Sequence, residues 1–126
     1  MKGFMTWLNK IIITLILCTH VCFGQTFIGE NNYKSKTGSG IVVIEVWADF
    51  NKDNSVDWIN DLKDCVVYRI RLEDCSELNV KTVPTVIIYS SGEEHSRYKA
   101  NIMLQLDATK KELQKVINEI VLSKFN

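Results

Sequence analysis

The alternation of apolar and polar residues predicts strands separated by short helices in the first half of the chain. Residues 41–48 form a continuous apolar run broken only by Glu45, which is typical of a central strand covered on both faces. Residues 66–72 alternate, with apolar side chains on one face and two arginines on the other, and predict a second strand. Between them, residues 55–63 place apolar side chains three apart and predict a short amphipathic helix.

The second half of the chain predicts a hairpin followed by a helix. A third strand begins at the chain's only proline, Pro84, a residue tolerated at the start of a strand because it lacks an N–H. The sequence "SGE" at residues 91–93 predicts a turn into an antiparallel strand over residues 93–103. Thr109 and Glu112 have the spacing of a capping box, and an apolar stripe at helical spacing follows them.

The N-terminal 24 residues have the pattern of a secretory signal peptide. Lysines but no acidic residues precede an apolar stretch over residues 11–23, which is shorter than the roughly 20 residues needed to span a bilayer. Cys22 and Gly24 are small residues at the positions that signal peptidase prefers. We therefore expect cleavage after Gly24 and a periplasmic or secreted bacterial protein without a membrane segment. An uncleaved anchor is the alternative.

The expected mature chain is a single domain with a polar extension. Residues 25–40 are polar, contain three glycines and have no sustained period, so they predict an N-terminal arm or linker before a domain over residues 41–126. Cleavage removes two lysines and no acid, which leaves 13 basic and 15 acidic residues and gives no indication of nucleic-acid binding. Cys65 and Cys75 are the cysteines that remain.

The ordered set of motifs resembles the thioredoxin family over residues 41–122. The strand end "IEVWA" is followed by "DFNKDN", and "TVPT" at residues 82–85 matches the start of the family's proline-containing strand. The turn, the second hairpin strand and the C-terminal amphipathic helix follow in the family's order. The resemblance implies an α/β thioredoxin-like three-layer sandwich, with a mixed sheet flanked by helices and a shortened first helix.

The resemblance also assigns positions to candidate site residues. The sequence Asn51-Lys52-Asp53-Asn54 stands where the family has C-x-x-C, and Phe50 stands for the tryptophan before it. Pro84 matches the cis-proline, whose preceding residue, here Val83, presents its backbone to a bound extended peptide. Thiol–disulfide exchange needs a thiolate, which an asparagine side chain cannot supply. Dithiol catalysis at this position is therefore excluded.

These positions lead to the principal functional hypothesis, a redox-inactive exported domain that binds a protein or an extended peptide. The groove beside the cis-proline would be formed by Trp47, Phe50, Asn51, Asn54, Val83 and Pro84. Glu45 matches the family's buried acid, and we expect it to carry a raised pKa or to pair with a lysine such as Lys63.

The first alternative is a thiol oxidoreductase that acts through Cys75 or Cys65 with an external thiol. The predicted strand between them is roughly 20 Å long, whereas a disulfide needs Cα atoms within about 7 Å, so a bond between the two is not expected. Buried, unreactive thiols are the simpler interpretation.

The second alternative is a calcium-stabilised module. Asp49, Asn51, Asp53 and Asp57 have the spacing of the first oxygen ligands of an EF-hand loop, but Asn60 stands where the bidentate acid belongs. The same residues are favoured at turns and helix caps, so a polar cap is the preferred interpretation and no cofactor is expected.

Overall fold

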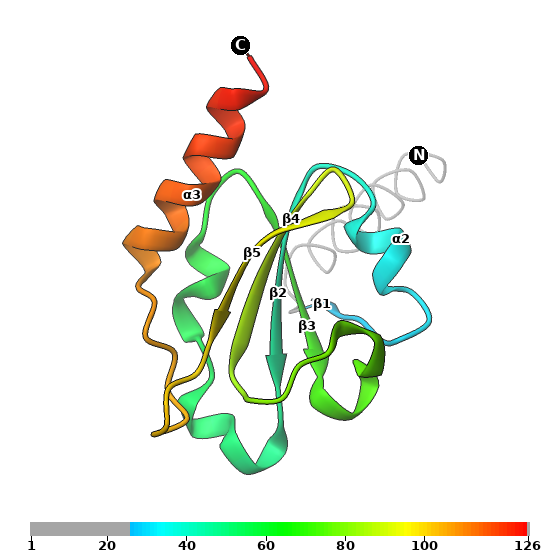
Figure 1. Ribbon diagram of the computed structural model, residues 1–126, viewed down its shortest axis with the longest axis vertical. Coiled ribbons are helices and arrows are strands. Elements are labelled where there is room, and N and C mark those ends of the chain that lie inside the picture. Colours follow the sequence, from blue (N-terminus) through cyan, green and yellow to red (C-terminus); the bar gives the residue numbers. More distant parts are fainter. Residues whose placement is uncertain (1–25, 126) are drawn as a thin grey trace, which may run out of the picture.

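The computed structural model describes residues 26–125, which form a five-stranded mixed sheet with the order β1-β3-β2-β4-β5 (Figure 1). The strands are β1 (Thr26–Phe27), β2 (Ile41–Trp47), β3 (Val66–Arg71), β4 (Thr85–Ser90) and β5 (Glu93–Lys99). β3 pairs in parallel with β1 and β2, whereas β4 pairs antiparallel with β2 and β5. The predicted mixed sheet is confirmed.

Helices lie on both sides of this sheet. The helices are α2 (Tyr33–Thr37), α3 (Lys110–Ser123) and four 3₁₀ segments, η1 (Asp49–Asn54), η2 (Asp57–Asp61), η3 (Leu72–Asp74) and η4 (Ser76–Leu78). α3 and η2 pack on one face, and α2 and η4 pack on the other, so the domain has three layers.

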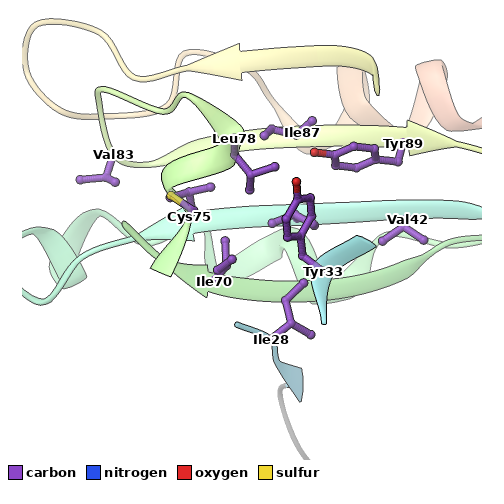
Figure 2. Close-up of a cluster of buried hydrophobic side chains, with 11 residues drawn as sticks. Ile28, Tyr33, Val42, Ile70, Cys75, Leu78, Val83, Ile87 and Tyr89 are labelled. Carbon is purple, nitrogen blue, oxygen red and sulfur yellow. The ribbon is translucent and has the colours of Figure 1, made fainter. Parts of the chain in front are cut away.

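β2 is the centre of the core because its side chains are buried on both faces. Val42, Ile44 and Val46 belong to a cluster with Leu78 and residues of β3 and β4. Figure 2 shows Val42 in this cluster. Ile41 and Val43 point the other way, toward the residues that η2 and α3 contribute, namely Ile59, Leu113, Ile117 and Ile120. The uninterrupted apolar run therefore predicted the environment of this strand correctly.

The segment predicted as an arm or linker, residues 25–40, is instead built into the domain from Thr26 onward. β1 pairs with β3, and the N–H of Ile28 donates to the carbonyl oxygen of Arg69 at 2.8 Å. Ile28 and Tyr33 are buried in the core cluster of Figure 2. The linker prediction is wrong here because two apolar residues in a polar segment give no periodic signal, although each fills a core position.

The helix predicted over residues 55–63 is also wrong in type. Ser55 and Val56 have non-helical backbone conformations, and the helical turn η2 begins only at Asp57. The N–H of Val56 donates to the carboxylate of Glu45 rather than to a helical carbonyl. No side chain caps η2, so the predicted polar cap is not formed.

The hairpin and the last helix agree with their predictions, except that β5 ends at Lys99 and not at residue 103. Ser91 and Gly92, both with positive φ, form the tight turn between β4 and β5. The Thr109 hydroxyl oxygen accepts from the N–H of Glu112 at 3.2 Å and caps α3. Among residues 26–125, no helix is long and apolar enough to cross a membrane. The predicted signal peptide lies outside the described residues.

Candidate functional site

The candidate site lies where β2 delivers the chain to η1, beside the start of β4. The Val83–Pro84 peptide bond is cis. The side-chain amide of Asn51 donates to the carbonyl oxygen of Val83 at 2.7 Å and to that of Leu104 at 3.1 Å. The Asn51 side chain of η1 therefore joins the segment that leads into β4 to the loop that follows β5.

The side chain of Asn54 is hydrogen-bonded to that of Asn51. The amide of Asn54 donates to Oδ1 of Asn51 at 2.9 Å, and both side chains are half-buried. This contact joins the two short turns of η1 across a kink, where the backbone of Asn51 is not helical (φ −123°, ψ 21°). We call the hydrogen bonds that join Asn51 to Val83, Leu104 and Asn54 the Asn51 bridge.

The loop that follows β5 was not predicted, because the strand was expected to continue through residue 103. Asn101 holds a tight turn, because its Oδ1 accepts from the N–H groups of Met103 at 2.8 Å and Gln105 at 3.1 Å. Leu104 takes a positive φ of 58° within this turn. The sequence signal was an asparagine at the start of a segment with no strand alternation.

This turn leaves large apolar side chains in solvent next to the Asn51 bridge. Ile102 is 98% exposed and Met103 is 70% exposed, while Phe50, on the other side of the bridge, is 74% exposed. Phe50 adjoins Asn51 and Met103 adjoins Leu104 in the chain, so the hydrogen bond between Asn51 and Leu104 brings the two apolar segments together. We call Phe50, Ile102 and Met103 the apolar rim.

The residues of the predicted groove are mostly buried or bonded to one another. Val83 and Pro84 are buried, and the carbonyl oxygen of Val83 already accepts the Asn51 amide. Trp47 is half-buried against Phe27, with ring centroids 6.0 Å apart, and the Arg71 guanidinium lies 5.1 Å from its ring centroid. Of the six predicted groove residues, Phe50 is the exposed one.

Glu45 lies fully buried on the η2 side of the sheet. Its carboxylate accepts from the N–H of Val56 at 3.2 and 3.3 Å, and the Arg69 guanidinium lies 3.7 Å away. Burial raises the pKa of the Glu45 carboxyl, while the charge of Arg69 and the Val56 N–H oppose that shift. The expectation that Lys63 pairs with Glu45 is wrong, because the parallel register of β2 and β3 places Arg69 directly opposite Glu45.

Neither cysteine of the described residues has the environment of a reactive thiol. Burial raises the pKa of Cys65 to about 11, and the nearby Asp64 adds to the shift. Burial also raises the pKa of Cys75, whose thiol donates to the carbonyl oxygen of Leu72 at 3.1 Å. A nucleophilic cysteine needs the opposite shift, toward the thiolate.

The residues proposed for calcium do not converge on one point. A carboxylate oxygen of Asp49 lies 3.7 Å from the Arg71 guanidinium, and the Asn51 amide belongs to the bridge. Asp53 and Asp57 are exposed. Within residues 26–125, no three or more His, Cys, Asp or Glu side chains form a group that could hold a metal ion.

Comparison with known proteins gives matches among solved structures. No protein-family profile and no curated protein matches the chain. A mutant thioredoxin from Halobacterium salinarum matches with a TM-score of 0.59 at 18% identity, over 76% of this chain and 89% of that one. The thioredoxin of Malassezia sympodialis matches with a TM-score of 0.56 at 19% identity, over 76% and 90%.

A third match broadens the comparison beyond thioredoxins themselves. A chain from a structure concerning yeast mitochondrial 1-Cys peroxiredoxin and the glutathione/thioredoxin systems has a TM-score of 0.57 at 14% identity, over 76% of this chain and 95% of that one. Together with the mixed sheet, the helices on both of its faces and the element order, these matches establish that the chain has a thioredoxin-like fold.

Proposed function

We propose that this protein is a redox-inactive, exported thioredoxin-like domain that binds a protein or peptide partner at the apolar rim around the Asn51 bridge. The observation that carries the proposal is the Asn51 amide itself. It stands at the position of the first cysteine of the family's motif and donates to the Val83 carbonyl that a bound peptide would otherwise use. Export rests on the signal-like sequence of residues 1–24.

The loss of redox activity follows from the chemistry of the side chains. Asn51 and Asn54 carry amides, which neither attack a disulfide nor form one. The raised pKa values of Cys65 and Cys75 leave little thiolate at neutral pH. The thiol chemistry named for the peroxiredoxin structure has no counterpart among these groups.

Partner binding is supported by the exposure of the apolar rim. Scattered apolar side chains are ordinary on a protein surface, but a group of large ones held beside a polar bridge is typical of an interaction site. The turn fixed by Asn101 reduces the entropy that Ile102 and Met103 would lose on binding. We infer that the partner is an extended segment whose apolar side chains contact Phe50 and Ile102.

The way the partner binds differs from simple strand addition. Strand addition at Val83 would require an accessible backbone, but Val83 is buried and its carbonyl oxygen already accepts a hydrogen bond from Asn51. Side-chain contacts with the apolar rim therefore supply most of the affinity in this proposal.

The test is a selection of random displayed peptides on the purified protein, followed by anisotropy measurements with the enriched peptides. The double variant F50S/I102S should bind them at least roughly tenfold more weakly, because a buried aromatic or aliphatic contact contributes about 1 kcal/mol or more. L122S/F125S is the matched control, since it removes two apolar side chains that are 64% and 81% exposed near the end of α3. Equal loss in both variants, or no enrichment of peptides, would overturn the proposal.

A further inference from the structure

A basic pocket lies beside the segment that leads into Pro84. Its volume is about 300 Å³, and it is bounded by the segment that leads into Pro84 and by the end of β5. Lys81 and Thr82 line it from the first segment, and Arg97 and Lys99 line it from β5. No carboxylate is among the described residues that line the pocket, so its charge is positive.

Arg97 forms the fixed wall of this pocket. Its guanidinium donates to the carbonyl oxygens of Leu78 at 2.8 Å and Asn79 at 3.2 Å, and to both carboxylate oxygens of Glu94 at 2.7 and 3.2 Å. A guanidinium has five N–H donors, so four are occupied by these contacts. Glu94 neutralises the charge of Arg97, and the charge left over comes from the two lysines.

Lys81 and Lys99 have no such partner within the described part of the chain. No carboxylate among residues 26–125 lies within ion-pair distance of either ammonium group, whereas Lys34 and Lys110 each have one. Thr85, whose backbone pairs with Lys99 across the sheet, donates its hydroxyl proton to the Thr82 carbonyl and so holds the lining segment against β4. Two ammonium groups that are not neutralised by residues 26–125 therefore border a hollow whose walls are fixed by hydrogen bonds.

We propose that this pocket binds an oxyanion, either a carboxylate or a phosphate group, between Lys81 and Lys99. Ammonium groups bind such oxygens as compact charges, and the Thr82 hydroxyl offers a further donor beside them. The site is separate from the apolar rim, and it stands or falls independently of the proposed partner binding. Because the pocket is open to solvent, its affinity falls with ionic strength.

The experiment is a titration of the ¹⁵N-labelled protein with glutarate, and separately with inorganic phosphate, followed by amide NMR at low salt. The amides of Lys81, Thr82 and Lys99 should shift and saturate. The variant K81Q/K99Q should raise the apparent Kd roughly tenfold, which corresponds to about 1.4 kcal/mol. K110Q/K111Q is the matched control, because it removes the same charge from the surface of α3, and its Kd should stay within about twofold.

The two probes identify the source of the oxyanion. Tighter binding of glutarate assigns the site to carboxylates, and tighter binding of phosphate assigns it to phosphate groups. Shifts that do not saturate, or that both double variants reduce equally, would mean nonspecific attraction to lysines and would overturn the proposal. Unmoved resonances at residues 79–85 would overturn it as well.

Discussion

Replacing Asn51 with alanine tests whether the Asn51 bridge holds the site together. The change removes three hydrogen bonds, those to Val83 and Leu104 and the one from Asn54. A hydrogen bond contributes about 0.5–1.5 kcal/mol net, and the half-buried position favours the lower part of the resulting range, roughly 2 kcal/mol. For a domain of this size, that loss corresponds to a fall in Tm of about 8–16 °C.

The assay is urea and thermal unfolding followed by circular dichroism, with N60A as the matched control. Asn60 is an exposed asparagine of η2, and its replacement should change the free energy of unfolding by less than about 0.5 kcal/mol. The variant N51D tests in which direction the destabilisation changes with pH. Its carboxylate would face two carbonyl oxygens, so its folded-state pKa would be raised and its destabilisation would shrink as the pH falls through that value. An N51A variant as stable as N60A would refute this reasoning.

Three further predictions address the buried acid, the thiols and the replaced motif. Burial raises the folded-state pKa of Glu45, so the free energy of unfolding of the wild type relative to E45Q should decrease as the pH rises from below the unfolded pKa of about 4.3 through the folded pKa. Urea unfolding across that range measures this difference, with the exposed E119Q as control. A difference that does not change with pH would contradict the raised pKa of Glu45. At pH 8, a pKa of about 11 leaves roughly one Cys65 thiol in a thousand ionised, so alkylation of Cys65 should be slow until denaturant is added. Rapid alkylation of the folded protein would instead support the oxidoreductase hypothesis. In N51C/N54C, the two thiols should form a disulfide and resist alkylation until reduced, because the side chains of Asn51 and Asn54 already meet, with Nδ2 and Oδ1 2.9 Å apart. Freely alkylated thiols in the oxidised double variant would show that η1 does not bring these two positions together.

Local periodicity was enough to predict the parts of the fold whose burial is regular. β2 is apolar on both faces because it lies between β3 and β4 under two helical layers, and α3 buries one stripe and carries its own cap. That Asn51 and Val83 line one site was implied by the resemblance to the thioredoxin family and not by periodicity.

The missed features depend on contacts between distant residues. The partner of Glu45 is set by the register of β2 against β3, which no local pattern reveals. The same carboxylate takes the N–H of Val56 and prevents the longer helix that the spacing predicted. β1 is only two residues long, and its pairing with β3 left no alternation to recognise.

Two residues of the apolar rim, Ile102 and Met103, were missed for a related reason. The predicted strand ran through Ile102 and Met103, and the one local sign that it ends earlier is the turn-favouring Asn101 before them. The side chain of Asn101 ends the strand by binding two backbone N–H groups of its own turn. The exposure of the two residues follows from that local hydrogen bonding and not from hydrophobicity.

The central claim is that the surface around the Asn51 bridge binds a partner, and site-specific photo-crosslinking tests it most directly. A photoreactive phenylalanine analogue would be placed at Phe50, and in a separate variant at Phe125, in the cells that make the protein. The proposed function predicts a discrete crosslinked protein from position 50, its loss when I102S is added, and no such product from position 125. No discrete product from position 50, or the same products from both positions, would contradict it.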